Sequence, residues 1–497
     1  MMPLPLAALS IANPFKPFVR IGLDGMGEKN VLQKNAVGFW GVVFYAVSVI
    51  FPAGAFAITG VAAMTFAGAT APLAFLVGGI TLFLAIIAVY IFSQKVSNAG
   101  GYYKYVEAAT KNKYVGKSVG LWNLFWVVGD MIAASIIVGW FTWVGLSSLL
   151  NYTLPFIWVV ALSLVVPILY LFVGYFGIKV AAKAAITIGA LQIIFFLLLA
   201  FAFMAKTPYN SGSYFNIANS TGGLSGFFLA VVVGAFLAYG GYGSVVSLGE
   251  EAKMSKKTLK KAIVTALLIM VAFDTIVVYS IVAAAGPGLS TASGSFAPGL
   301  YLTQQYFGVG LALLAFTFVL VAQVFSPVIF GNSGARVMFA LARDGLLPKS
   351  LSQVHKKYKS PHVATLWLFG IVVVGVLATM LPLVAIFGES AGLFDSWVIW
   401  GISITIFTLM YHIAVNTSLP FYVKRVKERF SWLVHVIAPG LASLIMLVAI
   451  YYSLVGLTSP LSLAYIMVPA WVVIGLALIY WRRSKVKAVV FPTRRGA

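Results

Sequence analysis

Long apolar stretches and short polar segments alternate along the whole chain. A run of about 20 apolar residues is long enough to cross a bilayer as a helix. Twelve such runs are present, at roughly 36–63, 70–92, 119–146, 155–174, 184–204, 224–247, 262–285, 307–335, 364–382, 393–414, 433–456 and 461–481. The pattern predicts an all-α polytopic membrane protein with 12 transmembrane helices.

Two of these runs are interrupted near their middle, at corresponding places five spans apart. The first contains Pro-Ala-Gly at 52–54, and the sixth contains Tyr-Gly-Gly-Tyr-Gly at 239–243. Pro52 cannot donate a backbone hydrogen bond and disfavours helix at the residue before it, and clustered glycines weaken a helix. We expect the first helix to stop at 50–51 and to restart at 55–56.

Each interruption has a simpler explanation. The first could be a proline kink, and the glycines of the sixth run could serve close helix packing. The pairing favours broken helices, because such breaks at matching positions of two halves are typical of the binding site of a secondary transporter. The restarted half-helix would offer free N–H groups to a carboxylate, and the last carbonyls of the first half would suit an ammonium group.

The distribution of charge predicts a membrane topology. The net charge is +22, and 32 of the 33 Lys and Arg residues fall on one side of the predicted membrane, with Lys206 alone on the other. This positive-inside pattern places both termini in the cytoplasm, and we expect a multi-pass protein of the plasma membrane. It also accounts for the excess of basic residues, so a nucleic-acid partner is not needed to explain the net charge. Residues 1–14 are apolar but lack a basic start, so we expect no cleaved signal peptide.

The composition argues against several other classes. Charged residues make up 9% and hydrophobic residues 61% of the chain, against about 25% charged residues in soluble proteins. There is no cysteine, and the four histidines are scattered, so we expect no disulfide, no metal site and no cofactor. No buried nucleophile–base pair points to an enzyme, and a respiratory proton-pumping subunit would need a file of mid-membrane Lys, Glu and His.

Three segments resemble the amino acid–polyamine–organocation superfamily of transporters. They are FLAYGGYGSVVSLGEEAKMSKKTLKKAI (236–263), SNAGGYYKYVEAATKN (97–112) and ARVMFALARDGLLPKSLSQVHKKYKSP (335–361). The resemblance implies the leucine-transporter-type fold, in which two inverted five-helix repeats are followed by two further helices. The implied parts are a cytoplasmic tail (1–35), the first repeat (36–204), the second repeat (224–414), helices 11 and 12 (433–481) and a basic cytoplasmic tail (482–497).

The resemblance also implies where substrate binds. The substrate carboxylate would meet backbone N–H groups at the first break, and its amine would meet carbonyls at both breaks, while an aromatic side chain closes over it. The matching positions here are Ala53, Gly54 and Ala55 for the carboxylate, Ile50, Leu237 and Gly240 for the amine, and Phe236 or Tyr239 for the aromatic. Many relatives carry Gly-Ser-Gly at the first break and an acidic residue at the position of Gly243, so this chain lacks a hydroxyl and a carboxylate there.

Two carboxylates are predicted to lie in the middle of the membrane, Asp130 in the third run and Asp274 in the seventh. Such residues are costly and mark functional sites by default. Asp130, with Trp126 one turn before it, could pair with a cationic or amine group of the substrate, could carry a coupling proton, or could make a helix-packing hydrogen bond. For Asp274 we favour a structural role.

Other residues are candidates for ion coupling and gating. Gln192 occupies the place where proton-coupled relatives often have lysine, and it cannot change charge. Ser333 could contribute to a sodium site. Glu250 and Arg336 could form a charge lock on the inner face, or both could be solvated.

Two further features leave alternatives open. Ser326 and Gln323 could face the substrate or could make interhelical hydrogen bonds. The segment 98–111 is amphipathic and tyrosine-rich, and we expect it to lie flat at the membrane interface.

Together these features predict a secondary active transporter of amino acids that works by alternating access, with substrate bound at broken helices 1 and 6. We expect proton coupling, with sodium as the other possible ion. The alternative is an amino acid/polyamine exchanger for cationic substrates, in which Asp130 recognises the cation. The expected partners are the small-molecule substrate, the coupling ion and the lipid bilayer.

Overall fold

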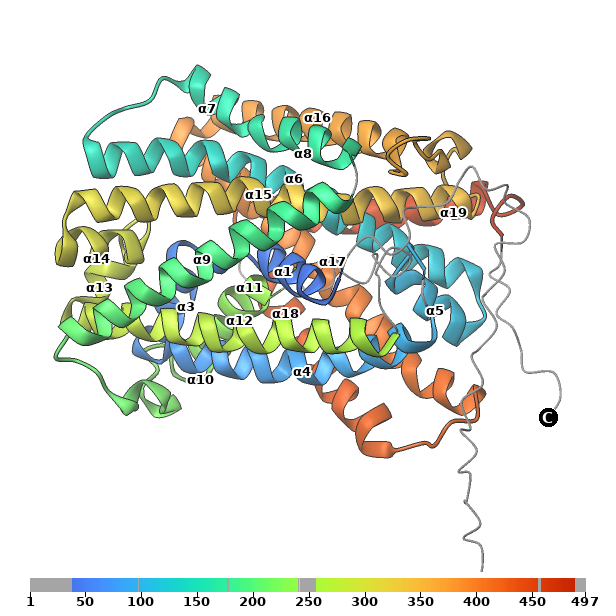
Figure 1. The fold of residues 1–497 in the computed structure, drawn as a ribbon, viewed down its shortest axis with the longest axis horizontal. Coiled ribbons are helices and arrows are strands. Elements are labelled where there is room, and N and C mark those ends of the chain that lie inside the picture. Colours follow the sequence, from blue (N-terminus) through green and yellow to red (C-terminus); the bar gives the residue numbers. More distant parts are fainter. Residues whose placement is uncertain are drawn as a thin grey trace, which may run out of the picture.

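The computed structural model describes residues 38–96, 98–176, 178–239, 241, 256–454 and 457–487, and these form helices and connecting turns without strands (Figure 1). Eleven helices in this part of the chain are long and apolar enough to cross a membrane. The shorter apolar helix Gly223–Tyr239 stands at the place of the sixth span. The all-α polytopic prediction is confirmed, whereas the division into two inverted repeats stays a prediction.

The first span is broken where the sequence indicated. Helix α1 (Phe39–Ile50) ends at Phe51, which has left-handed backbone angles (φ 63°, ψ 72°) that are rare for a bulky residue. Helix α2 (Pro52–Ala57) begins at once, because proline suits the first position of a helix, where no donor is needed. The restart therefore comes three residues before the predicted 55–56. A bend at Ile58 leads into α3 (Thr59–Ala67).

The structure describes the sixth span as far as its glycine-rich segment, so the second predicted break, at 239–243, lies largely outside the described residues. Helix α10 (Gly223–Ala230) continues through a π-helical segment, η5 (Val231–Phe236), into α11 (Leu237–Tyr239). A Cβ atom built on Gly241 would lie 2.5 Å from the carbonyl oxygen of Val49. Gly241 therefore packs directly against the last turn of α1, and only a glycine fits at this contact.

The remaining helices form the bundle around these two spans. They are α4 (Ala71–Lys95), α5 (Tyr102–Thr110), α6 (Lys113–Leu150), α7 (Phe156–Ser163), α8 (Val165–Phe176), α9 (Ile178–Lys206), α12 (Lys256–Ala285), α13 (Leu289–Ser293), α14 (Pro298–Phe307), α15 (Val309–Arg343), α16 (His362–Phe387), α17 (Glu389–Arg425), α18 (Ala438–Leu454) and α19 (Ala464–Trp481). Helix α6 packs against both α15 and α17. All three helices extend beyond the predicted apolar runs at one end or both.

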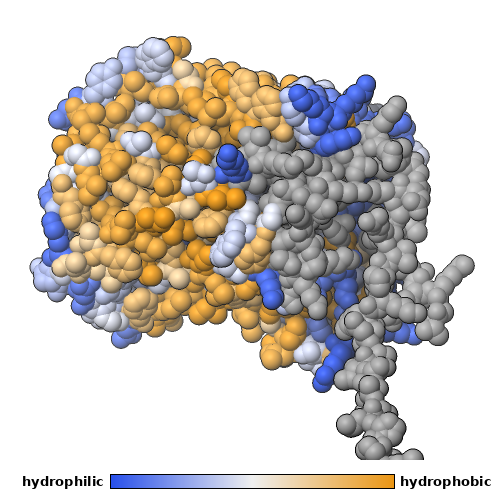
Figure 2. Space-filling view, viewed as in Figure 1, coloured by the Kyte–Doolittle hydropathy of each residue, from blue (hydrophilic) through white to orange (hydrophobic). Residues whose placement is uncertain are grey.

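Apolar side chains cover the middle of the molecule, and hydrophilic residues lie toward its two ends (Figure 2). Trp158, Leu198 and Ile386 are 60%, 66% and 70% exposed. In water such a belt would be unfavourable, but lipid tails solvate it. Helices α13 and α14 lie at one end of the bundle and α5 at the other (Figure 1).

Helix α5 does not expose its tyrosines, which were expected to face the membrane interface. It packs against α6 and α17, and its residues Tyr102, Tyr103 and Tyr105 are 2%, 0% and 2% exposed. Tyr105 stacks on Phe92 of α4 with ring centroids 5.2 Å apart. The tyrosines thus fill the interior at this end of the bundle, because neighbouring helices cover both sides of α5.

Candidate functional site

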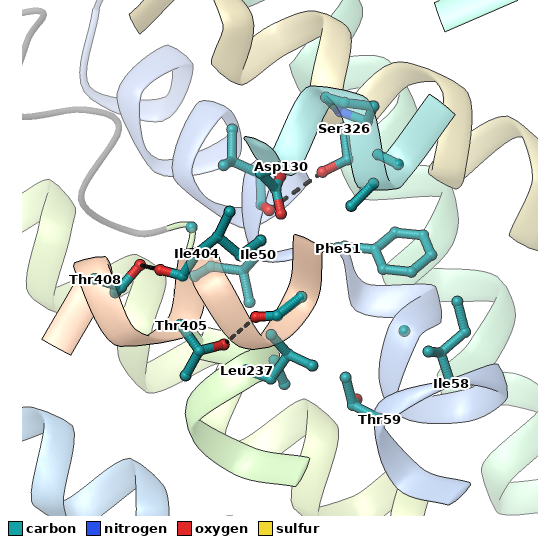
Figure 3. A pocket seen from close by; sticks show the side chains of 18 of the residues that line it. Ile50, Phe51, Ile58, Thr59, Asp130, Leu237, Ser326, Ile404, Thr405 and Thr408 are labelled. Carbon is teal, nitrogen blue, oxygen red and sulfur yellow. Dashed lines mark hydrogen bonds between the residues drawn. The ribbon is translucent and has the colours of Figure 1, made fainter. Parts of the chain in front are cut away.

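A pocket of about 160 Å³ lies in the middle of the bundle, at the break of the first span (Figure 3). Its walls come from the end of α1 and the start of α2, from α6, from the last turns of the sixth span, and from α15 and α17. An apolar cavity of about 150 Å³ accepts a benzene molecule. The pocket therefore has room for a small organic ligand.

Seven residues of the predicted substrate site line this pocket: Ile50, Gly54, Trp126, Asp130, Phe236, Leu237 and Ser326. Ala53, Ala55 and Tyr239 are buried but do not line it. Gly240 lies outside the described residues. The structure thus brings together residues from the first, third, sixth and eighth spans around one pocket.

One of the backbone N–H groups at the first break already has a hydrogen-bond partner in this conformation. The N–H of Gly54, one of the predicted carboxylate ligands, donates to the carbonyl oxygen of Phe51 at 2.8 Å. The Phe51 ring lies over the same residue, because a Cβ on Gly54 would approach its Cδ1 to 2.6 Å. Phe51 also lines the pocket. A substrate carboxylate would reach this amide only if the ring and the hydrogen bond shift.

Ser326 makes the interhelical hydrogen bond considered for it and also faces the pocket. Its hydroxyl donates to the carbonyl oxygen of Val49 at 3.2 Å, and it also lines the pocket (Figure 3). Val49 lies in the last turn of α1, where carbonyls have no partner within the helix. Nearby, the hydroxyl of Tyr45 donates to the carbonyl of Ile329 at 2.6 Å. These two bonds fix α15 against the broken helix.

Asp130 is the one acidic residue among the described residues that line the pocket, and none of those residues is basic. It is half-buried on α6 and points toward the same part of the pocket as Ser326 (Figure 3). Trp126, one turn before it, stacks on Phe330 with ring centroids 5.7 Å apart. A carboxylate in such a place is neutralised by a proton or by a cationic group that a ligand supplies.

Helix α17 supplies one wall that sequence reasoning missed. Trp397, Gly401, Ile404, Thr405, Thr408 and Leu409 line the pocket from this helix. The hydroxyls of Thr405 and Thr408 donate to Gly401 and Ile404 of their own helix, both at 2.8 Å. Two hydroxyls three residues apart were the available signal, but their orientation toward the pocket depends on how α17 packs against α6.

Two polar side chains in the wall have unmet hydrogen-bonding groups. Gln323 is 3% exposed, and neither its amide oxygen nor its amide nitrogen has a partner among the described residues. The hydroxyl of Thr59 is also unpartnered within this part of the chain. Buried polar groups are rarely left unpaired, so a polar ligand or water in the pocket would complete them.

Three of the residues predicted for coupling and gating do not line the pocket, whereas Asp130, which was also considered for the coupling proton, does. Gln192 on α9 and Ser333 on α15 are 2% and 3% exposed, and neither lines it. Arg336 is 1% exposed and donates to the carbonyl of Asn332 at 2.6 Å, so it is not part of a solvated surface. Its proposed partner Glu250 lies outside the described residues.

A buried group of four charges, the inner charge cluster, joins α5, α6 and the end of α15. The Nζ of Lys104 lies 2.5 Å from an Asp344 carboxylate oxygen, and the Nζ of Lys117 lies 2.7 Å from the same oxygen and 2.9 Å from Glu107. Burial by itself raises the pKa of Asp344, but the two ammonium groups hold it below its usual value. Burial lowers the pKa of Lys104, and the charge of Asp344 opposes this effect.

Comparison with known proteins agrees with this architecture. The family model described as amino acid permease matches residues 41–489. The branched-chain amino acid permease BcaP of Bacillus subtilis (strain 168) is 29% identical over 381 residues, which are 72% of this chain and 77% of the relative. A methylthioribose transporter of the same bacterium is 26% identical over 345 residues, which are 65% of this chain and 70% of the relative.

The family match confirms the resemblance to the amino acid–polyamine–organocation superfamily, because it spans nearly all of the predicted membrane helices. The chain therefore belongs to the amino acid permease family, and it is a multi-pass amino acid transporter of the plasma membrane.

Proposed function

We propose that this protein is a secondary active transporter that moves amino acids by alternating access and that its substrate occupies the central pocket. The observation that carries the proposal is the position of this pocket, at the contact between the broken first span and the end of the sixth. Broken helices free backbone groups at mid-membrane that only protein, water or a ligand can satisfy.

The lining favours an amino acid with an apolar side chain. Ile50, Ile58, Ile137 and Ile404 contribute much of the wall and would contact such a side chain. Asp130 would bind the substrate's ammonium group and so gain the cation that the lining lacks. The relative named a branched-chain amino acid permease supports this choice.

A second candidate is exchange of cationic amino acids or polyamines. Asp130 is the observation that favours it, because a carboxylate in a pocket without basic residues suits a substrate with an additional positive charge. Transport would then depend on substrate on the opposite side of the membrane rather than on an ion gradient.

Uptake into liposomes that contain the purified protein tests these proposals. Labelled leucine, lysine and putrescine are offered with an acidic exterior, with equal pH on both sides, or with unlabelled substrate inside. We expect acid-driven uptake of leucine. Asp130→Asn should bind leucine at least tenfold more weakly, about the 1.5–3 kcal/mol of a charged hydrogen bond.

Asp395→Asn is a matched control, since this acidic residue of α17 does not line the pocket. Uptake of lysine or putrescine only against internal substrate would favour the exchanger instead. If none of the three compounds moves under any condition, the proposal of amino acid transport through this pocket is refuted.

A further inference from the structure

A second membrane carboxylate, Asp274, lies outside the pocket and differs from Asp130 in its surroundings. It stands near the middle of the span that begins at Lys261 and is 1% exposed. Both of its carboxylate oxygens are buried without a hydrogen-bond partner among the described residues. It does not line the pocket, so substrate bound there would not reach it.

The groups around Asp274 do not supply a counter-charge. Helix α12 packs mainly against α1, α2, α4 and α9, with smaller contacts to α13 and α14. Besides Tyr239 of α11, the titratable residues on these helices are Tyr45, Tyr90, Lys95, Lys179, Lys183, Lys206, Tyr301 and Tyr306. Lys95 pairs with Glu428, and Lys206 contacts the carbonyl of Tyr306 at the opposite end. Within the described residues, no ion pair reaches Asp274.

Tyr239 of α11 lies close to Asp274. Its hydroxyl donates to the carbonyl of Phe75 at 3.2 Å, and its ring meets the Phe75 ring edge to face. Tyr239 is also the last residue of α11. Helix α12, which carries Asp274, packs against both α1 and α2, so a change at Asp274 acts next to the break of the first span.

An ionised carboxylate without a partner in an apolar interior is strongly disfavoured, and a bound proton removes the charge. We propose that Asp274 is a proton-binding site that couples proton movement to substrate transport, while Asp130 contacts the substrate. Asp274 holds its proton in this conformation and releases it when a change at the first-span break, against which α12 packs, admits water. The inference rests on the proposed transport function and assigns the coupling ion to one residue.

Acid-driven accumulation and substrate exchange, measured on the same liposomes with labelled leucine, separate the two roles. With one proton moved per substrate, a gradient of one pH unit concentrates leucine by up to about tenfold. Asp274→Asn should abolish this concentration but should exchange internal for external leucine within about twofold of the unchanged protein. Ser280→Ala is the matched control, because it alters a buried polar side chain of the same helix, whose hydroxyl bonds to Val277 of that helix, without removing a titratable group, and it should accumulate leucine normally.

A second variant keeps the test decisive if Asp274→Asn does not fold. Asp274→Glu retains a carboxyl group but moves it, so the pH of half-maximal acid-driven uptake should shift while accumulation persists. An unchanged pH profile in this variant would overturn the proposal.

Failure of the Asp274 inference and failure of the transport proposal would give different results. Normal acid-driven accumulation by Asp274→Asn would place the proton elsewhere, and loss of exchange by a folded Asp274→Asn would assign the residue to the conformational change itself. Exchange without any acid-driven accumulation by the unchanged protein would also refute this inference and leave the transporter intact. Absence of both activities in the unchanged protein would refute the transport proposal instead.

Discussion

Substitution of Asp344 by Asn tests how the inner charge cluster stabilises the fold. Asp344 binds Lys104 at 2.5 Å and Lys117 at 2.7 Å, and the side chains of these lysines are 2% and 0% exposed. Without Asp344 the two lysines would share Glu107, which lies 3.6 Å from Lys104 and 2.9 Å from Lys117. Removal of one partner from a buried ion pair costs about 3–5 kcal/mol, because an uncompensated charge stays buried. We expect Asp344→Asn to lower stability by this amount near neutral pH.

The pH dependence of this effect has a definite sign. The folded-state pKa of Lys104 is already below its ordinary value of 10.5 because of burial, and loss of the Asp344 charge lowers it further. The unfolded chain then holds more protons between the lowered pKa and 10.5, so stability of the variant rises with pH in that window. The penalty should therefore shrink under alkaline conditions.

At acidic pH the two proteins should converge. The folded-state pKa of Asp344 lies below 3.8, so its contribution is complete above the unfolded value. It is lost as the pH falls through the folded value. The difference between Asp344→Asn and the unchanged protein should therefore narrow at the acid end as well.

Thermal unfolding of the purified protein in detergent measures these effects. At roughly 2 °C per kcal/mol, Asp344→Asn should lower Tm by about 6–10 °C near neutral pH. Glu428→Gln is the matched control, because the pair Lys95–Glu428 is exposed and exposed pairs contribute about 0–1 kcal/mol. The double variant Asp344→Asn/Lys104→Met, which removes both charges, should regain part of the loss. Equal Tm values for Asp344→Asn and Glu428→Gln, or a penalty that persists at alkaline pH, would refute the reasoning.

Three other substitutions probe the broken helices. Gly241→Ala places a methyl group 2.5 Å from the carbonyl oxygen of Val49, so leucine uptake should fall at least tenfold, whereas Gly370→Ala, with open space around its Cβ, should transport normally. Ser326→Ala leaves the Val49 carbonyl without its side-chain donor and should cost about 1–3 kcal/mol by thermal unfolding, which Ser326→Thr should largely restore. Phe51→Gly relieves a left-handed residue by about 1–2 kcal/mol, so Tm should hold or rise while leucine binding weakens; a fall in Tm would contradict the strain argument.

The sequence predicted the position of the first helix break because its cause is local. Pro52 acts on the backbone within one turn, whatever surrounds it. The restart of the first span was predicted three residues too late. The second helix can begin directly at Pro52, because the first helical position needs no N–H donor and Phe51 alone adopts the backbone angles of the break.

The lining of the pocket could be predicted only in part. Trp126 and Asp130 were identified because polar and aromatic residues in the middle of an apolar run are conspicuous. The wall from α17 was missed, because Thr405 and Thr408 do not differ from other hydroxyls that bond to their own helix. Which face of α17 turns inward depends on its packing against α6.

The amino-acid sequence alone determined the membrane class, the helical spans and the break of the first span, because bilayer thickness and backbone chemistry act on consecutive residues. Tertiary structure alone decided which charges meet. Lys104 and Asp344 are 240 residues apart and yet form the shortest contact of the inner charge cluster. It also separated Asp130 from Asp274, since both interrupt apolar runs but only one faces the pocket. Burial and partnership depend on how helices pack, and side chains from distant spans determine that packing.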